Sequence, residues 1–432
     1  MASTRSEPGS ASTNGKKWWH WLEPWYLAYG LQGATVAGLA PILLPLAVST
    51  QGSAAHVGLV MAAFNLGGLL APLWGGLADR LRLHRWLLLG GLLATAASLA
   101  AFAFAGHIAT WVALALLAGM GAAATATVAN LFIVEVHPKR EWDERIGWLQ
   151  TSYGAGQVGG LLVAGAVSQA YLQPGLLAAA GLSALAAVAG AVTTDTPPES
   201  EGPKPVLLNP SQIGEWALNA PQRLFHHVTG RALDLLGEAL RSPFGLFMLA
   251  WLLAFGGSTA VFSLYPVMMR ELFGINSGVS SSTFALAAGV GILLYSPAGA
   301  LSDRIGPMRV IQAALSLRFL AVLAMLGLGL SQLAVAGWLA LFTFALVVLS
   351  WSFLTVAGTA LAAQLSPVSQ GEAMGIFNAM TAGAGVIGSV LGGWAASTWG
   401  YAAAPAVAVG GVGLGLAVSA IVDSGQSEPA QE

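Results

Sequence analysis

Two short stretches decide the fold of this chain: GGLADR at residues 75–80 and GALSDR at residues 299–304. A second pair, GAGQVG at 154–159 and GAGVIG at 383–388, repeats at nearly the same spacing. The offset is 224 residues for the first pair and 229 for the second. Two unrelated signatures that repeat at nearly one spacing indicate a tandem duplication, so we expect two homologous halves.

The composition around these stretches is that of a membrane protein. Of the 432 residues, 56% are hydrophobic and only 8% are charged, whereas an ordinary soluble domain has roughly 25% charged residues. The apolar residues form blocks of about 20, the length that a helix needs to cross a bilayer. We therefore predict an all-α polytopic membrane protein of about twelve transmembrane helices in two six-helix parallel repeats. The predicted spans are 25–49, 56–77, 86–105, 110–134, 146–168, 175–193, 243–269, 278–301, 310–330, 334–362, 373–397 and 402–422.

The sequence also excludes several kinds of chemistry. There is no cysteine, which rules out disulfides, thiolate metal sites and cysteine nucleophiles. The sequence has no recognisable catalytic triad, metal-ligand cluster or phosphate-binding loop. We therefore expect no enzyme activity, no catalytic residue, no metal, no cofactor and no nucleic-acid partner.

The positions of Lys and Arg predict the orientation, because cationic loops close to a span resist translocation. If the N-terminus is cytoplasmic, sixteen of the seventeen Lys and Arg lie in cytoplasmic segments or in spans that begin there, and Arg270 is the exception. We predict a multi-pass protein of the cell membrane with both termini in the cytoplasm. Its expected parts are an N-terminal tail (1–24), a six-helix bundle (25–193), a cytoplasmic linker (194–242), a second bundle (243–422) and a C-terminal tail (423–432).

The linker has a composition of its own. It begins with a polar, proline-rich run, and apolar residues then recur at helical spacing between Leu224 and Ala239. This pattern predicts an amphipathic helix on the inner membrane surface. A lead-in to the seventh span without a function is the alternative.

The two Gly-x-Leu-x-Asp-Arg loops resemble the loop signature of the major facilitator superfamily, and the resemblance covers roughly residues 25–422. It implies a transporter similar to the branch that exports drugs and metabolites. Arg82 and Leu83 depart from the family pattern after the first copy. Ala155-Gly156 stands where the family's antiporters have Gly-Pro, which argues against antiport.

The resemblance also implies an inner gate. In similar proteins the motif Asp caps the eleventh helix, and the basic loop pairs with an acid at the inner end of the fourth, which closes the halves toward the cytoplasm. The corresponding residues are Asp79, Arg80, Glu135, Asp303 and Arg304. The position 229 residues after Glu135 is Gln364, so we expect an asymmetric latch that is stronger on the Asp79 side. The alternative is that both loops are only tight, positive turns.

Transport sites in such folds lie near the bilayer midplane between the repeats. Polar or aromatic residues predicted near that depth are Gln32, Asn65, Gln157, Ser258, Thr259, Ser350 and Trp351, with Tyr29, Tyr265 and Asn378 nearer an end. We expect the substrate cavity among these residues. Each of them can instead hydrogen-bond a neighbouring helix.

Charged residues near mid-depth are scarce. Proton-coupled transporters usually keep an Asp, Glu or His there, and no carboxylate is predicted at that depth, so coupling to protons should be weak or absent. A proton or another coupling ion is kept as a possible partner. Ala115 occupies the position at which drug exporters of the family carry an Arg, which argues against a strongly charged cargo. Arg318 is the one candidate for a buried ion: it snorkels or bonds carbonyls, or it forms an anion or counter-ion site.

The sequence therefore predicts a secondary active transporter or facilitator that moves a small neutral or apolar solute by alternating access. Export is favoured over import by family analogy alone. We expect a monomer in contact with membrane lipid. The alternative from another class is a non-transporting membrane receptor or assembly partner that retains the transporter fold.

Overall fold

A computed structural model describes residues 23–71, 73–74, 84–138, 141–168, 171–193, 242–331, 333–367 and 370–427. All regular structure in these ranges is helical, which confirms the predicted all-α class. Ten helices are long and apolar enough to cross a membrane, and a shorter apolar helix, α3 (Ala54–Gly68), lies among them. With α7 (Trp142–Val167) they form a multi-pass protein with the predicted number of spans.

The first span consists of three consecutive segments: α1 (Tyr26–Gln32), the π-helix η2 (Gly33–Leu39) and α2 (Ala40–Ser49). The π-helical segment lies just before Pro41, and this proline has no N–H with which to continue the α-helical hydrogen-bond pattern. The N–H of Ala40 bonds the carbonyl of Thr35, five residues back. The other helices of the first half are α3, α5 (His84–Phe102), α6 (Ile108–Val136), α7 and α8 (Leu172–Thr193).

The second half contains α11 (Pro243–Phe273), α12 (Ser277–Ile305), α13 (Pro307–Leu330), α14 (Ala336–Leu365), α15 (Gln370–Trp399) and α16 (Ala403–Ser427). Local sequence sets several of these boundaries. The side chain of Asn276 caps α12 by accepting from Val279 N. Gly274, with φ of 66°, ends α11, and Gly306, with φ of 89°, separates α12 from α13. Only glycine adopts such positive φ values readily.

Most boundaries differ from the prediction by a few residues, and α3 ends at Gly68 rather than near 77. Helix α7 begins at Trp142 rather than near 146, and Arg145 in its first turn bonds Glu141 four residues earlier, a pairing that stabilises a helix start. Helix α16 continues to Ser427, into the predicted C-terminal tail. The linker with its amphipathic helix, most of the N-terminal tail and the last five residues lie outside the described residues.

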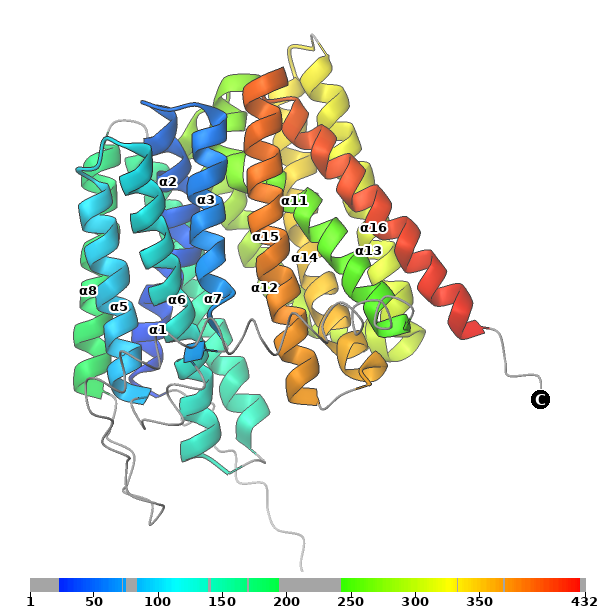
Figure 1. Ribbon diagram of the computed structural model, residues 1–432, viewed down its shortest axis with the longest axis horizontal. Helices are drawn as coiled ribbons and strands as arrows, with labels where there is room; N and C mark the ends of the chain where they lie inside the picture. Colours follow the sequence, from blue (N-terminus) through cyan, green and yellow to red (C-terminus); the bar gives the residue numbers. More distant parts are fainter. Residues whose placement is uncertain are drawn as a thin grey trace, which may run out of the picture.

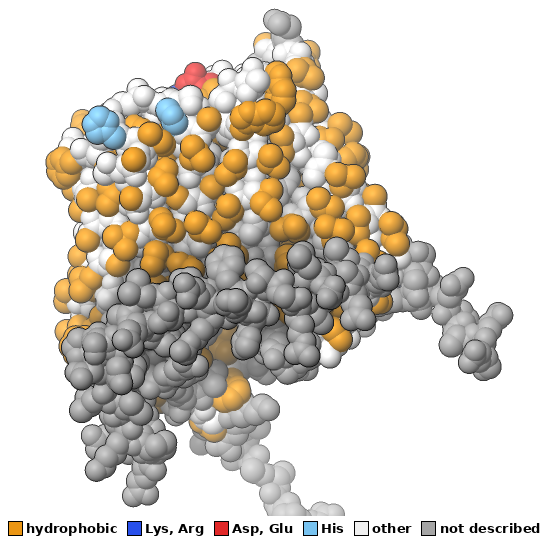
Figure 2. All heavy atoms as spheres, viewed as in Figure 1, with side chains coloured by type: hydrophobic (Ala, Val, Ile, Leu, Met, Phe, Trp, Pro, Cys, Tyr) orange, Lys and Arg blue, Asp and Glu red, His pale blue; other side chains and the backbone are white. Residues whose placement is uncertain are grey.

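The two halves lie side by side (Figure 1), with α3 against α15 and α7 against α12. We call the upper end in Figure 1, which carries the connections near Thr50, Ala105, Gly274 and Gly400, the short-loop end, and the opposite one the Asp303 end. Hydrophobic side chains cover the visible membrane-facing surface (Figure 2), and the His and acidic side chains in this view lie at its upper edge.

Among the described residues, the hydrophobic core is continuous between the halves at one end only. Near the short-loop end a single cluster includes residues of both halves, such as Leu43 and Leu264. Toward the Asp303 end the core divides in two. One cluster, around Trp25 and Phe132, belongs to the first half, and the other, around Phe247, to the second. The halves are therefore joined at the short-loop end.

Candidate functional site: the interface between the halves

The repeated glycine signature packs the fifth span of each half against the first. A Cβ on Gly156 would lie 1.8 Å from the carbonyl oxygen of Gly30, and a Cβ on Gly388 would lie 2.0 Å from that of Gly256. Only glycine allows such an approach of two helix backbones. The same close packing recurs in both halves, which matches the sequence repeat.

Between the halves, Asn65 of α3 reaches α15. Its Nδ2 donates to Ser389 Oγ at 3.3 Å and to the carbonyl of Gly385 at 3.4 Å. Ser389 Oγ lies 2.6 Å from Ser263 Oγ on α11. The structure thus places Asn65, a predicted cavity residue, in a hydrogen-bond chain that crosses from one half to the other.

Glycines line the same interface on both sides of the molecule. A Cβ on Gly58 of α3 would meet Gly393 Cα at 2.8 Å, and a Cβ on Gly165 of α7 would meet the carbonyl of Gly278 at 3.1 Å. Small residues at these positions let the helix backbones of the two halves approach closely. Such contacts fit static packing of the halves as well as movement of one half against the other.

A polar contact closes the short-loop end. Arg270 Nη2 donates to Ser49 Oγ at 3.2 Å, which connects α11 with α2, and Arg270 Nε bonds Glu271 at 2.8 Å. Burial, with Glu271 as a further cause, raises the pKa of Tyr401 in the α15–α16 connection, so its phenol stays uncharged. The arginine that departs from the positive-inside pattern thus bonds the two halves together.

The predicted cavity residues of the first half do not form one group. Gln32 is 1% exposed, and its Nε2 donates to the carbonyl of Ala122 on α6 at 3.0 Å, whereas its Oε1 has no hydrogen-bond partner. Tyr29 is buried against Tyr153, with ring centroids 5.0 Å apart. Gln157 is half-buried on α7.

In the second half, a group of predicted residues comes together around Arg318. Its Nε donates to Ser350 Oγ at 2.9 Å, its Nη1 to Ser258 Oγ at 3.2 Å and its Nη2 to the carbonyl of Val347 at 3.0 Å. Arg318 is fully buried, so the snorkelling hypothesis is wrong and the predicted carbonyl bond is confirmed.

The other three candidates of this half lie apart from that group. Thr259 bonds a carbonyl of its own helix, and Tyr265 donates to the carbonyl of Ser280 at 2.8 Å. Asn378 is exposed on α15. Tyr265 is therefore held within the second half, and neither it nor Thr259 bonds a residue of the first half.

An aromatic cluster extends from Arg318 toward the Asp303 end, and sequence reasoning missed most of it. Its members are Phe247, Trp251, Phe255, Trp351 and Phe377. Trp251 stacks on Phe255 with centroids 4.0 Å apart and lies 4.4 Å from Phe377, and Phe255 lies 4.7 Å from Trp351. Three members recur at i, i+4 and i+8 on α11, a spacing that places them on one helix face and could have revealed the cluster.

The predicted inner gate is described only in part. Asp303 and Arg304 are exposed at the end of α12, and neither forms an ion pair within the described ranges. Asp79 and Arg80 lie outside the described residues. Glu135 belongs to α6, but its side chain is not described. The asymmetric latch therefore stays a prediction.

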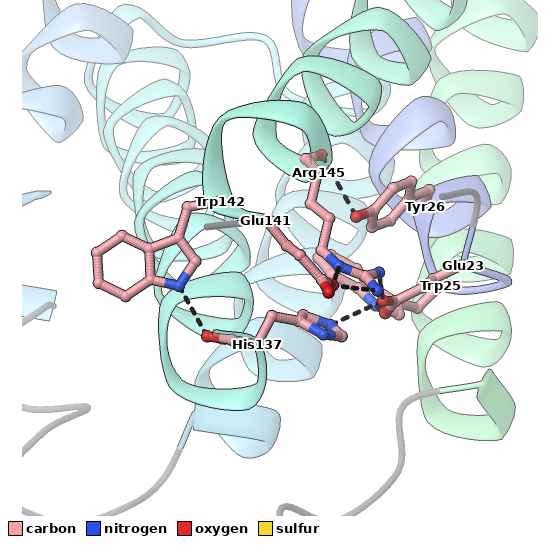
Figure 3. Close-up of polar contacts among 7 residues, drawn as sticks. All are labelled: Glu23, Trp25, Tyr26, His137, Glu141, Trp142 and Arg145. Carbon is pink, nitrogen blue, oxygen red and sulfur yellow. Dashed lines mark hydrogen bonds and ion pairs between the residues drawn. The ribbon is translucent and has the colours of Figure 1, made fainter. Parts of the chain in front are cut away.

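A charged cluster at the Asp303 end of the first half was not predicted (Figure 3). Glu23, just before α1, bonds Arg145 of α7, and it lies 2.8 Å from His137 Nε2 at the end of α6. Arg145 Nη2 also bonds Glu141 at 3.0 Å. The cluster ties the starts of α1 and α7 to the end of α6. In the part of the chain that the structure describes, no group of His, Asp and Glu could hold a metal ion.

The described helices form two halves of a polytopic membrane protein, joined through close glycine contacts and a few polar bonds. The sequence model of the Major Facilitator Superfamily matches residues 25–353. The chain belongs to the Major Facilitator Superfamily, and it is a transporter-family protein rather than an enzyme.

Individual relatives agree with this membership. The multidrug resistance protein MdtG of Rahnella sp. (strain Y9602) is 27% identical over 308 residues, which cover 68% of each chain. Among solved structures, the nucleoside transporter NupG has a TM-score of 0.69 at 14% identity, over 94% of this chain and 99% of its own. The peptide transporter POT in complex with sulfate has a TM-score of 0.71 at 16% identity, over 93% of both chains. At such identities the structural likeness shows the fold alone.

Proposed function

We propose that this protein carries a small neutral or apolar solute across the cell membrane by alternating access, with export as its direction. The observation that carries the proposal is the divided core. One hydrophobic cluster joins the halves at the short-loop end, and two separate clusters fill the halves toward the Asp303 end. Such an arrangement is expected of a carrier caught with one end closed.

The distribution of charge supports an assignment of the two ends. Arg85, Arg145, Arg304 and Arg309 lie near helix termini at the Asp303 end, whereas Arg270 lies at the short-loop end. Because cationic segments stay on the cytoplasmic side, we assign the Asp303 end and both termini to the cytoplasm. The contacts of Asn65 and Arg270 then close the outer side.

The lining of the second half supports an apolar solute. Within the aromatic cluster, Trp351 is half-buried and offers an apolar ring surface, whereas the other four members are buried. Gln32, Asn65, Gln157, Ser350, Trp351, Tyr29 and Asn378 remain the proposed cavity residues. The described acidic side chains lie at helix ends, as at Glu23, Glu271 and Asp303, which supports weak or absent coupling to protons. The sequence similarity to a protein named for multidrug resistance supports export over import.

We further propose that bundles of residues 25–193 and 243–422 are the moving units and that the carrier acts as a monomer surrounded by lipid. The test is reconstitution of the purified protein in liposomes. Flux of apolar solutes above that of empty vesicles supports a carrier. Binding without flux, across a broad solute panel and in both orientations, would favour the alternative of a receptor or assembly partner.

A further inference from the structure

Arg318 is an enclosed cation at the middle of a membrane-spanning helix. It is the twelfth of the 24 residues of α13, and its side chain is 0% exposed. The three hydrogen bonds to Ser350, Ser258 and Val347 all go to uncharged oxygens. A guanidinium has five N–H groups, so these bonds account for three of them.

Aromatic rings cover the guanidinium on another side. Its Cζ lies 5.7 Å from the centroid of Phe255 and 5.9 Å from that of Trp351. Both distances are within the range of a cation–π contact. Trp351 is half-buried, whereas Phe255 is buried. Trp351 is therefore the partly exposed member of the pair of rings that cover the charge.

No described carboxylate neutralises Arg318. In the described part of the second half, Glu271 is paired with Arg270 in the last turn of α11, and Asp303 is exposed in the last turn of α12. An ionised side chain within a membrane is costly and marks a substrate or ion pathway more often than a packing site. Its field also extends well beyond contact distance in a medium of low dielectric constant.

The first half has no cation at the position that corresponds to Arg318. By the 224-residue spacing of the Asp-Arg motifs, the counterpart of Arg318 in α5 is Ala94. By the 226-residue spacing of Gly30 and Gly256, which receive equivalent glycine contacts, the counterpart of Ser258 is Gln32. Gln32 bridges to α6 as an uncharged amide. A polar bridge from the first to the fourth span therefore exists in both halves, and only one of the two contains a cation.

We infer that Arg318 determines the charge selectivity of the carrier, and that its solute is a weak acid with an apolar body and a single carboxylate. The apolar body packs against the exposed part of Trp351, and the carboxylate is attracted by the uncompensated charge of Arg318 next to that ring. Cationic molecules of the same shape are disfavoured by that charge. This inference rests on the proposed alternating-access carrier and changes the proposed solute from a neutral or apolar molecule to an apolar body that carries one negative charge.

Binding of three matched probes to the purified protein at pH 7.5 tests the inference. The probes are 4-phenylbutyrate, 4-phenylbutanol and 4-phenylbutylamine, which share one apolar body and differ in charge. The acid should bind tightest and exceed the amine by about tenfold in affinity. In the Arg318→Gln variant the ratio of acid to amine affinity should fall to about one, whereas Arg318→Lys should keep the preference.

Two further variants separate charge from folding. Ser258→Asp places a carboxylate beside Arg318 Nη1 and should also remove the preference for the acid. Arg309→Gln removes an exposed cation near the start of the same helix and should leave the preference unchanged. The inference is overturned if the unmodified protein binds the amine as tightly as the acid, or if folded Arg318→Gln or Ser258→Asp retains the original ratio.

Flux measurements keep this inference distinct from the proposed function. Preferential binding of the acid without flux in liposomes would reject the carrier and leave the role of Arg318 intact. Flux of apolar solutes with no preference for the acid would support the carrier and reject the role of Arg318.

Discussion

The amide of Asn65 donates to the hydroxyl of Ser389 at 3.3 Å, and this bond crosses from the first half of the molecule to the second. The two residues are separated by 324 positions in the chain. Ser389 in turn lies 2.6 Å from Ser263. Together with the contact of Arg270 and Ser49, this chain of hydroxyl and amide groups holds the short-loop end closed.

Asn65→Ala should shift the carrier toward a form that is open at the short-loop end. A hydrogen bond contributes about 0.5–1.5 kcal/mol, which changes a two-state population by roughly two- to tenfold. The chain has no cysteine, so spin labels can be attached at Gln51→Cys and Thr398→Cys, which are exposed at that end in opposite halves. The distance between the labels should increase in the variant. Thr359→Ala, whose hydroxyl bonds only α14 carbonyls, should leave the distances unchanged.

Glycines of the repeated signature should differ sharply in their tolerance of alanine. Gly156→Ala and Gly388→Ala place a methyl group about 2 Å from a carbonyl oxygen of the first span of their half, and overpacking costs about 1–3 kcal/mol or more. Gly159→Ala and Gly383→Ala are matched controls, because nothing lies within 4 Å of a Cβ there. Thermal stability of the purified variants measures the difference. Equal losses in both pairs would contradict the packing described above.

The proposed cavity residues should differ in their reactivity toward a small water-soluble thiol reagent. Gln157→Cys and Trp351→Cys should react, because both positions are half-buried. Gln32→Cys should react slowly, since Gln32 is 1% exposed. Rates are followed by labelling in membranes, and a transported solute should protect the reactive pair. Inertness of both Gln157→Cys and Trp351→Cys would remove these positions from the pathway.

Solute flux should depend only weakly on a pH gradient. The described acidic side chains lie at helix ends rather than at mid-depth, where proton-coupled transporters usually carry one. Collapse of the gradient with a protonophore should change the flux of an uncharged solute less than about twofold. Neutralising the charged cluster of Figure 3 with Glu23→Gln or His137→Asn should not alter this result. Acidification of vesicles in strict proportion to the solute moved would show the expectation to be wrong.

Asp79→Asn should impair transport more than Asp303→Asn. An anion near a helix N-terminus contributes about 0.3–1 kcal/mol, and up to about 2 when partly buried, which is small for folding but large for a two-state carrier. Asp303 is exposed without an ion pair in the described part of the chain. In the second half, Gln364 occupies the position that corresponds to Glu135, so that half lacks the second acid of the latch. Flux per inserted molecule compares the two variants. Normal transport by Asp79→Asn, or a greater sensitivity at Asp303, would reject the asymmetric latch.

The sequence by itself determined the elements and their repetition. Apolar blocks of membrane-spanning length predicted the helices, because the bilayer requires every backbone group to be bonded within a segment. The duplicated Asp-Arg and glycine signatures predicted two homologous halves. These are properties of local sequence, and they do not depend on which helices become neighbours.

Tertiary structure alone decided which polar residues meet. Asn65 and Gln157 were equivalent candidates in the sequence, yet only Asn65 bonds the opposite half. In the sequence Arg318 is a single cation with no evident partner. In the structure α11 and α14 place Ser258 and Ser350 within hydrogen-bond distance of its guanidinium. The reason is geometric: a membrane-spanning sequence is apolar on nearly every face, so its hydrophobic pattern does not specify rotation about the helix axis. Packing against neighbouring helices fixes that rotation, and with it the partners of each polar side chain.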